Sequence, residues 1–419
     1  MTKKESGVRS QKSEARSQKS ESLRAAAVGL AAAAALWSWM FLTVRFNYGG
    51  NWTALYMIGP RTPVPESIAG ERLYIFQNTS GYDGQSFHTM AHDPWMLRNT
   101  PAEVEIAPFR YARILVPALA WIMALGRDRW IDAAYFAVIL AFAFLGAYWL
   151  ALYAARASRS AAWGLAFVLS PATLTSIDRM TVDIALAALC AAFALYSERG
   201  RLDTSKTPWK VTLVLACALL TRETAWLLFA AYEVFLLARG RFSDARFTLI
   251  AAIPAIAWQA YIAARTGESA MPPRVLGWIP FAGFFDRISH PASYHLAAGL
   301  NTLAISCDYI ALAGIALALA ITIMIARPIA RKEPWTPLDS AISAFALAVV
   351  FLRGRIEWED AYAFGRIFAP LLLLIAMHSL RGRTRSLASL GMAPTLLVDA
   401  RIALNLGKQA LGVMHGLIR

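Results

Sequence analysis

Charged residues are scarce in this 419-residue chain. Only 16% of the residues are Asp, Glu, Lys or Arg, whereas 58% are hydrophobic and the mean hydropathy is +0.45. A chain of this length has room for two or three soluble domains, but this composition argues against them. Apolar runs recur along the chain, and in lipid each run must satisfy its own backbone hydrogen bonds. The sequence therefore predicts an all-α, polytopic membrane protein built as a bundle of transmembrane helices.

Cysteines are also few, and their positions exclude one class of site. The chain has three, Cys190, Cys217 and Cys307, and each lies in or beside an apolar run. Their spacing matches no metal-binding pattern. We interpret them as small core side chains.

Acidic residues are in deficit, with 27 Asp and Glu against 41 Lys and Arg, which gives a net charge of +14. The basic residues are scattered between apolar runs and no nucleic-acid-binding module surrounds them. We therefore expect no nucleic-acid partner and instead a membrane with anionic lipids. The 14 Trp and 14 Tyr are residues that favour the membrane interface.

Residues 1–24 are polar and contain the repeat RSQKSE at 9–14 and at 16–21. Such a segment has too few apolar residues to form a core, so we expect a disordered cytoplasmic tail. The Ala-rich run at 25–44 has the length of one membrane crossing and is expected to be a retained anchor.

Nine further apolar runs follow, which makes about ten expected spans in a transmembrane domain at 25–385. The runs are 131–153, 161–177, 182–196, 209–220, 224–238, 247–264, 301–326, 338–352 and 364–380. Residues 45–110 contain no run of that length and are expected to form a long loop.

The apolar segment 111–125 is short for a crossing, and the charges decide its assignment. If it does not cross, one set of later connections, taken as cytoplasmic, has nearly twice as many Lys and Arg as the opposite set. If it crosses, the positive-inside tendency is violated. We therefore expect an interfacial or re-entrant helix inside one large outer (periplasmic) loop at 45–130, with both termini cytoplasmic. A miscount of short helices is the alternative.

The C-terminal stretch 386–419 mixes apolar and charged residues, among them Asp399, Arg401 and Lys408. It is expected to lie on the cytoplasmic surface as an amphipathic helix. An eleventh span is the alternative.

Asp83 is the first candidate for chemistry, because it lies between glycines in the motif GYDGQ of the long loop. Gly81 and Gly84 allow a tight turn that presents the carboxylate. An ionised Asp can act as a general base toward an attacking hydroxyl. The simpler interpretation is an Asp-Gly turn without chemistry.

His88 and His92 follow at a spacing that places them on one face of a helix. Together with Asp83 or Asp93 they could hold a divalent cation. Surface or interfacial histidines are the alternative. Asp93 precedes Pro94 and is expected to end the short helix.

Two acids flank Arg179 at the expected outer end of two spans. Asp183 begins an apolar helix, where a carboxylate needs a partner or a water-filled cavity, and Asp178 precedes the arginine. Pairing of Asp183 with Arg179 is one interpretation and a substrate site is the other.

Arg222 and Glu223 separate two apolar segments in the sequence LLTRETAWLL. An arginine at the expected outer surface of the membrane could bind a lipid phosphate through two hydrogen bonds. An ion pair with Glu223 is the alternative. Arg366 follows a charged loop at 353–360, for which phosphate or sugar contacts and simple solvation are both open.

The order of these motifs resembles the GT-C superfamily of integral-membrane glycosyltransferases, which use polyprenyl-phosphate sugars. Its members have a first outer loop with a catalytic Asp and interfacial helices, then a second acid after a Ser-Pro pair. Here these positions fall on Asp83, on 111–125, on Ser170-Pro171 and on Asp183. A basic residue after a Leu-Thr pair is the next family feature, and Arg222 stands where Lys is commoner. An adjacent acidic pair, often found in related loops, is not evident.

The resemblance covers roughly residues 25–241. GYDGQ followed by the RxxRILxP pattern at Arg110 and Arg113 also resembles bacterial membrane proteins linked to cell-surface glycopolymer formation. The resemblance implies Asp83 and Asp183 as catalytic residues in a bacterial inner-membrane glycosyltransferase. Its partners would be a polyprenyl-phosphate sugar donor and a glycan, lipid or protein acceptor, and a divalent cation is the one cofactor considered. The expected substrate-binding residues are Tyr82, Gln85, Arg110, Arg113, Asp178, Arg179, Arg222, Glu223 and Arg366. A flippase for a lipid-linked glycan and a noncatalytic subunit of a glycan assembly complex are the rival functions.

Overall fold

The computed structural model describes residues 3–60, 64–65, 68–98, 104–198, 209–268, 275–294, 296–382 and 384–418. Within these ranges the chain is helical, and the β pairing consists of two isolated bridges, Ile58 with Ile75 and Leu276 with Leu352. The prediction of an all-α protein is thus confirmed for the described residues.

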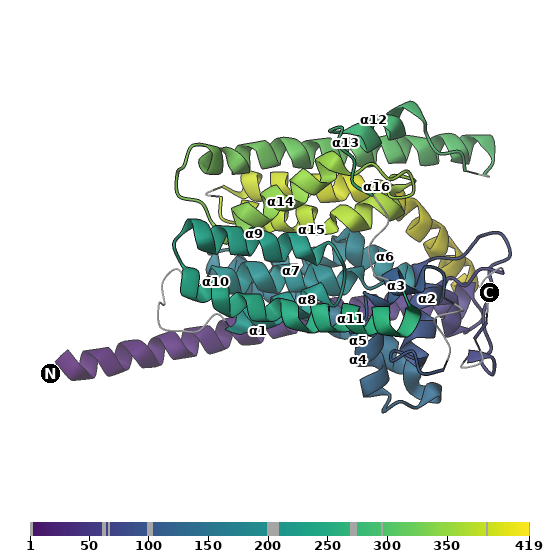
Figure 1. Cartoon of the computed structure of the whole chain (residues 1–419), viewed down its shortest axis with the longest axis horizontal. Helices are drawn as coiled ribbons and strands as arrows, with labels where there is room; N and C mark the ends of the chain where they lie inside the picture. The colour runs from purple at the N-terminus through teal and green to yellow at the C-terminus, as the bar shows by residue number, and fades with distance from the viewer. Residues whose placement is uncertain are drawn as a thin grey trace.

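The long helices run side by side and form an elongated bundle (Figure 1). Its first half contains α1 (Lys3–Asn47), α5 (Asp128–Arg156), η4 (Ala161–Leu169), α6 (Pro171–Arg179), α7 (Asp183–Ser197), α8 (Trp209–Leu219) and α9 (Ala225–Ala238). Its second half contains α10 (Phe242–Thr248), η6 (Leu249–Ala251), α11 (Ala252–Thr266), α13 (Ala298–Ala330), α14 (Pro337–Phe351), α15 (Ala361–Ser379) and α16 (Arg385–Ile418).

Short helices gather at one end of the bundle, which we call the loop end. These are η1 (Trp52–Tyr56), α2 (Asp83–His92), α3 (Ala107–Tyr111), α4 (Leu115–Met123) and α12 (Ala282–Ser289). The segment 111–125 is therefore mainly the nine-residue helix α4, which packs on α2 and α5. At 1.5 Å per residue α4 is roughly 14 Å long, about half the thickness of a bilayer core, so it is too short to cross alone.

Among the described residues, six helices are long and apolar enough to cross a membrane, which indicates an integral membrane protein. They are Gln18–Asn47, Asp128–Arg156, Phe242–Thr266, Ala298–Ala330, Ala361–Ser379 and Ser386–Ile418. Four shorter apolar helices, α7, α8, α9 and α14, complete the bundle. Exposed large side chains such as Leu237, Ile253 and Ile323 lie on the outside of the bundle, where lipid would cover them.

Helix α7 is the centre of the bundle, because nearly all of its side chains are buried. Its sequence is rich in alanine, and small residues let neighbouring helices approach closely. It packs against α5, α8 and α15. Asp183, the first residue of α7, is thereby held in the middle of the loop end.

The predicted span 161–177 is not one continuous α-helix. The chain forms a 3-10 helix, η4, and then begins α6 at Pro171 after Ser170. Proline fits the first turn of a helix, where its missing N–H is not needed, but it ends the preceding one. The polar side chains of Thr173, Thr175 and Ser176 on α6 are buried inside the bundle.

Residues 3–24 differ from the expected disordered tail, because α1 starts at Lys3 and runs without a break into the first apolar run. The segment contains no proline and a single glycine, Gly7. Starting a helix is the unfavourable step, and the apolar run already supplies the nucleus that the polar residues extend.

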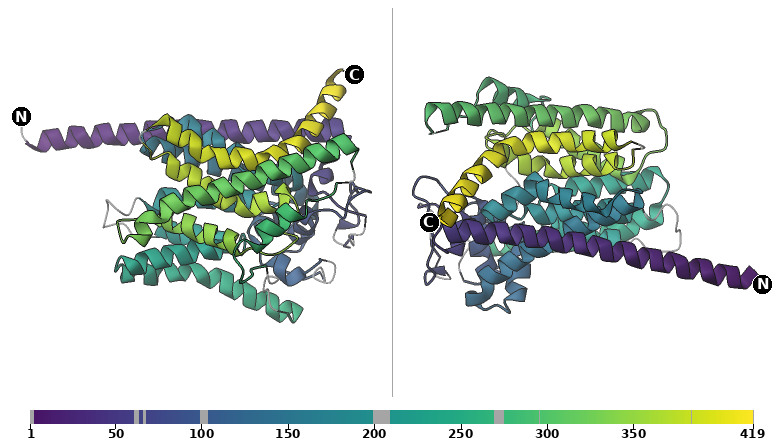
Figure 2. Two further views of the ribbon diagram at one scale, coloured as in Figure 1. Left: turned by 90° about the horizontal axis from the view of Figure 1, so that it is seen from above. Right: turned by 180° about the vertical axis from the view of Figure 1, so that it is seen from behind.

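The C-terminal segment differs from the expected amphipathic surface helix, because α16 is long and apolar enough to cross a membrane, as in the alternative of a further span. It packs against α13, α15 and α1 and crosses the bundle to the loop end, where Asn47 Nδ2 donates to the Gln409 carbonyl at 3.0 Å. The start of α1 and the end of α16 lie at opposite ends of the molecule (Figure 2). The charged residues misled the prediction, since Asp399 is in fact buried within the bundle.

Candidate functional site

The candidate site begins with the docking of α2 at the loop end. Gly81 has a positive φ of 89°, and the next turn starts the helix at Asp83. Gly84 faces the backbone of α6 and η1, where an added Cβ would lie 2.2 Å from the Arg179 carbonyl oxygen and 2.8 Å from that of Tyr56. The two glycines thus allow the first turn of α2 to touch the end of α6.

Replacing Gly84 with alanine should therefore displace the first turn of α2 and lower the free energy of unfolding by about 1 to 3 kcal/mol. The matched control is Gly407→Ala in α16, where an added Cβ meets nothing within 4 Å and alanine favours the helix. Chemical or thermal unfolding of both variants in detergent measures the difference. Equal stability of the two variants would contradict the close docking.

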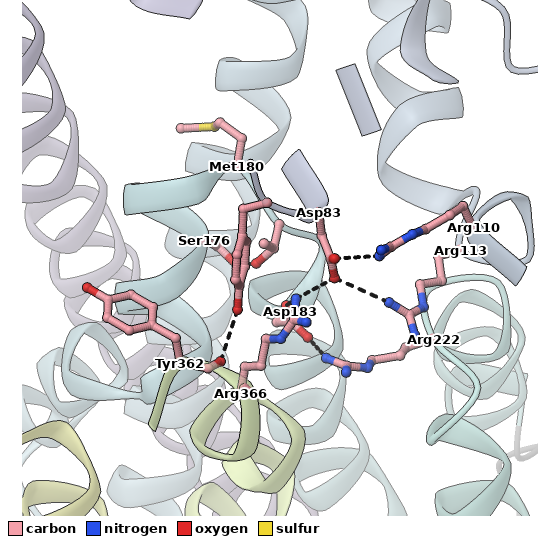
Figure 3. A network of polar contacts seen from close by, with 12 residues as sticks. Asp83, Arg110, Arg113, Ser176, Met180, Asp183, Arg222, Tyr362 and Arg366 are labelled. Atoms are coloured by element: carbon pink, nitrogen blue, oxygen red, sulfur yellow. Dashed lines mark hydrogen bonds and ion pairs between the residues drawn. The ribbon is translucent and has the colours of Figure 1, made fainter. Parts of the chain in front are cut away.

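Three arginines surround the buried carboxylate of Asp83 (Figure 3). Its Oδ1 lies 2.5 Å from Arg110 Nη1, and its Oδ2 lies 2.5 Å from Arg366 Nη1 and 3.7 Å from Arg113 Nη1. Burial alone would raise the pKa of Asp83, but the guanidinium groups of Arg366, Arg110 and Arg113 outweigh it and hold the pKa well below its usual range. Asp83 is therefore ionised.

Asp183 forms the second buried ion pair of the site, with Arg222. Both side chains are almost fully buried, and Arg366 Nη1 lies 3.8 Å from the other oxygen of Asp183. Arg366 on α15 thus connects the two carboxylates predicted to be catalytic. Pairing of Asp183 with Arg179, one of the two expected arrangements, does not occur.

Glu223 is bound mainly by Arg113 rather than by its neighbour Arg222. Arg113 donates through Nε at 2.9 Å and through Nη2 at 2.8 Å, whereas Arg222 Nε lies 3.7 Å from the carboxylate. This two-point geometry fixes the arginine plane. Burial would raise the pKa of Glu223, but Arg113 and Arg222 outweigh it and lower the pKa from 4.5 to about 2.

The low pKa of Glu223 predicts a pH dependence of stability. Its ionised form stabilises the fold, so this contribution is complete above pH 4.5 and is lost as the pH falls toward about 2. The variant Glu223→Gln should be less stable than the parent by a constant amount between pH 6 and pH 8, and the gap should shrink below 4.5. Thermal unfolding across this range measures it, with the exposed Glu268→Gln as the control. A gap that does not change with pH would contradict the assignment.

Aromatic rings and amides hold the remaining predicted binding residues. The guanidinium of Arg179 lies 4.3 Å from the ring centre of Tyr82 and 3.8 Å from that of Tyr362. Tyr82 donates its hydroxyl proton to the Tyr362 carbonyl at 3.2 Å. These contacts place Tyr82 and Arg179 beside Arg366, whose guanidinium lies 4.8 Å from the Tyr82 ring.

Asp178 and Gln85 have structural partners. Asn405 and Gln409 of α16 donate to Asp178 at 3.1 Å and 2.5 Å, and Arg179 Nε lies 3.4 Å away. Gln85 accepts from the Gly59 backbone N–H at 3.0 Å, which ties α2 to the loop that precedes it. Asp178 thereby attaches the C-terminal helix to the site.

The charges of the site do not cancel. Arg110, Arg113, Arg222 and Arg366 contribute four guanidinium groups, and Asp83, Asp183 and Glu223 contribute three carboxylates. The excess positive charge is buried at the boundary between the bundle and the loop. Such an arrangement suits an anion, and the planar guanidinium groups suit phosphate in particular.

The two histidines of α2 face away from Asp83 and belong to a second cluster. His88 Nε2 lies 3.1 Å from Glu71 Oε2 and 3.0 Å from Asp132 Oδ1, and His92 Nε2 lies 3.2 Å from Glu71 Oε1. The prediction that Asp83 or Asp93 would join them is therefore wrong. Asp93 instead accepts from the backbone N–H groups of Leu97 and Arg98 and ends the helix, as expected.

Comparisons of the chain with protein-family models, with curated proteins and with solved structures find no match.

Sequence reasoning missed three participants. Tyr362 lies two residues after Asp360, in the first turn of α15, and gave no separate signal. Asp132 is an acid within an apolar helix, a pattern that could have drawn attention to it. Glu71 is a single acid in an irregular loop, and only the fold brings it to the histidines.

Proposed function

We propose that the protein is a membrane glycosyltransferase that transfers a sugar from a polyprenyl-phosphate donor to an acceptor hydroxyl at the loop end. The observation that supports this most is the position of Asp83 among Arg110, Arg113 and Arg366, next to the Asp183–Arg222 pair. One site thus combines a candidate base with several phosphate-binding groups. The acceptor would be a cell-surface glycan, lipid or protein.

The arginines give the donor phosphate its binding site. A phosphate that enters the cluster competes with Asp83 for Arg110 and Arg366, both within 2.5 Å of that carboxylate. Arg222 stays beside Asp183 and adds a further positive charge. Because the donor is anionic, the excess positive charge of the cluster favours its binding.

Donor binding would also change the basicity of the Asp83 carboxylate. In the free protein its pKa is held low by the arginines, which makes the carboxylate a weak base. When the phosphate pairs with some of these guanidinium groups, their effect on Asp83 weakens. The pKa of Asp83 then rises, and proton transfer to its carboxylate becomes more favourable. The base would thus be activated only when the donor is present.

The reaction then proceeds as a displacement at the anomeric carbon. The acceptor oxygen forms the new glycosidic bond, its proton passes to Asp83, and the bond between the anomeric carbon and the phosphate oxygen breaks. Polyprenyl phosphate leaves with the bonding electron pair, and the arginines stabilise its developing charge. Asp183 would keep Arg222 and Arg366 in place during this step.

Purified protein in lipid vesicles, incubated with a labelled polyprenyl-phosphate sugar and candidate acceptors, tests the proposal. Transfer of label to an acceptor is the expected result. Movement of the intact donor across the bilayer without transfer would indicate a flippase instead. Binding of the donor without turnover would indicate a noncatalytic subunit, and either outcome overturns the proposal.

A further inference from the structure

Four side chains from three parts of the chain converge at the far end of α2. Glu71 comes from the loop, His88 and His92 from successive turns of α2, and Asp132 from the second turn of α5. One ligand atom of each lies within 4.8 Å of the others. We call these residues the His88 cluster.

The facing atoms of the His88 cluster are buried but not hydrogen-bonded. Glu71 Oε2, His88 Nε2, His92 Nε2 and Asp132 Oδ1 have no solvent contact and no partner with hydrogen-bond geometry among the described residues. The imidazole and carboxylate atoms lie 3.0 to 3.2 Å apart but are not directed at one another as in a hydrogen bond, which is rare for buried polar atoms and points to a cation at their centre. Both imidazole rings are fully buried, so water does not replace that cation easily.

The separations suit a small tetrahedral ion. Zinc binds imidazole nitrogen and carboxylate oxygen at roughly 2.0 to 2.2 Å, so neighbouring ligand atoms in a regular tetrahedron are about 3.3 to 3.6 Å apart. The three contacts between histidine and carboxylate are 3.0, 3.1 and 3.2 Å. Glu71 and Asp132 are partly exposed and can adjust to the remaining, wider separations.

The charges of the His88 cluster also favour the binding of a cation. Two carboxylates face two imidazoles, and the nearby Arg98 is bound to Asp128 at 2.9 and 3.0 Å instead. A divalent cation would neutralise both carboxylates.

The surroundings of His92 match those of metal-binding histidines. Its Nδ1 lies 3.2 Å from Asp128 Oδ1, so a proton on Nδ1 leaves the lone pair of Nε2 directed at the cluster. Carboxylates in this position commonly orient zinc-bound imidazoles. Tyr56 stacks on His88 with ring centres 4.2 Å apart and fixes the plane of that ring.

We propose that Glu71, His88, His92 and Asp132 bind one Zn²⁺ ion that joins the loop and α2 to α5. The ion has four protein ligands and no free position, which is typical of a structural rather than a catalytic site. Its effect on Asp83 is indirect, because it holds the helix that begins with that residue. The proposal is independent of sugar transfer.

Metal analysis of the full-length protein, purified in detergent and loaded with Zn²⁺ before removal of excess ion, tests the site. About one zinc per chain is expected, with an apparent melting temperature several degrees higher than that of the chelator-treated protein. The double variant His88→Gln/His92→Gln should lose the zinc. His290→Gln, which removes an exposed histidine beside Asp286, should retain it.

Cobalt provides a test that needs no variant. Co²⁺ in a four-coordinate site of nitrogen and oxygen ligands absorbs visible light far more strongly than hexahydrated Co²⁺, and Zn²⁺ should displace it. A chain without bound zinc after loading, and without this absorption with Co²⁺, would overturn the proposal. Zinc retained by the double variant would overturn it too.

Discussion

Asp83→Asn should lower the rate of sugar transfer by about 10²- to 10⁴-fold, the usual contribution of general-base catalysis. Asparagine keeps the shape of the side chain but cannot accept the proton of the acceptor hydroxyl. Measurement of initial rates with a polyprenyl-phosphate sugar gives the effect.

The Michaelis constant for the donor distinguishes a loss of catalysis from a loss of folded protein. Asp83 competes with the donor phosphate for Arg110 and Arg366, so the variant should bind the donor at least as tightly as the parent protein. A loss of fold alone would lower the amount of active protein and leave no such signature. Asp286→Asn, at an exposed carboxylate, is the matched control, and full activity of Asp83→Asn would contradict the assigned role.

Arg222→Met should reduce the free energy of unfolding by about 3 to 5 kcal/mol, since it leaves the buried Asp183 with only the more distant Arg366 as a cation. The same change at Arg241, whose pair with Asp244 is partly exposed, should reduce it by no more than about 1 kcal/mol. Denaturant titration in mixed micelles measures both.

A double-mutant cycle separates the ion pair from simple packing. When Asp183→Asn is added to Arg222→Met, the uncompensated charge disappears, so the double variant should recover part of the lost stability. Arg222→Lys keeps the charge and should fall between the parent and Arg222→Met. Additive losses in the cycle would show that the two residues do not depend on each other.

The sequence was sufficient for the positions of most helices, because apolar runs of membrane length must become helices in lipid. It was also sufficient to place Asp83, Asp183 and Arg222 near one another, since the distribution of Lys and Arg predicts one common end for them. The charged residues of 386–419 instead led to the expectation of a surface helix. Composition does not reveal that residues such as Asp399 are buried within the bundle.

The sequence alone could not predict which acidic residue pairs with which arginine. Asp83 pairs with Arg110, which is near it in the sequence, but it also bonds to Arg366, which is 283 residues away. Asp183 pairs with Arg222 rather than with Arg179. The guanidinium of Arg179, at the end of α6, lies over the rings of Tyr82 and Tyr362 instead. Such choices depend on helix packing, and equal charges leave many pairings with similar energies until that packing is fixed.

The place of α16 has a consequence for biosynthesis. This helix leaves the ribosome after α6, yet its Asn405 and Gln409 hold Asp178 at the site. The earlier helices are therefore inserted before that acid has its amide partners. The amide partners of Asp178 are therefore supplied only after α16 has been synthesised, and a chain terminated before Asn405 would lack them.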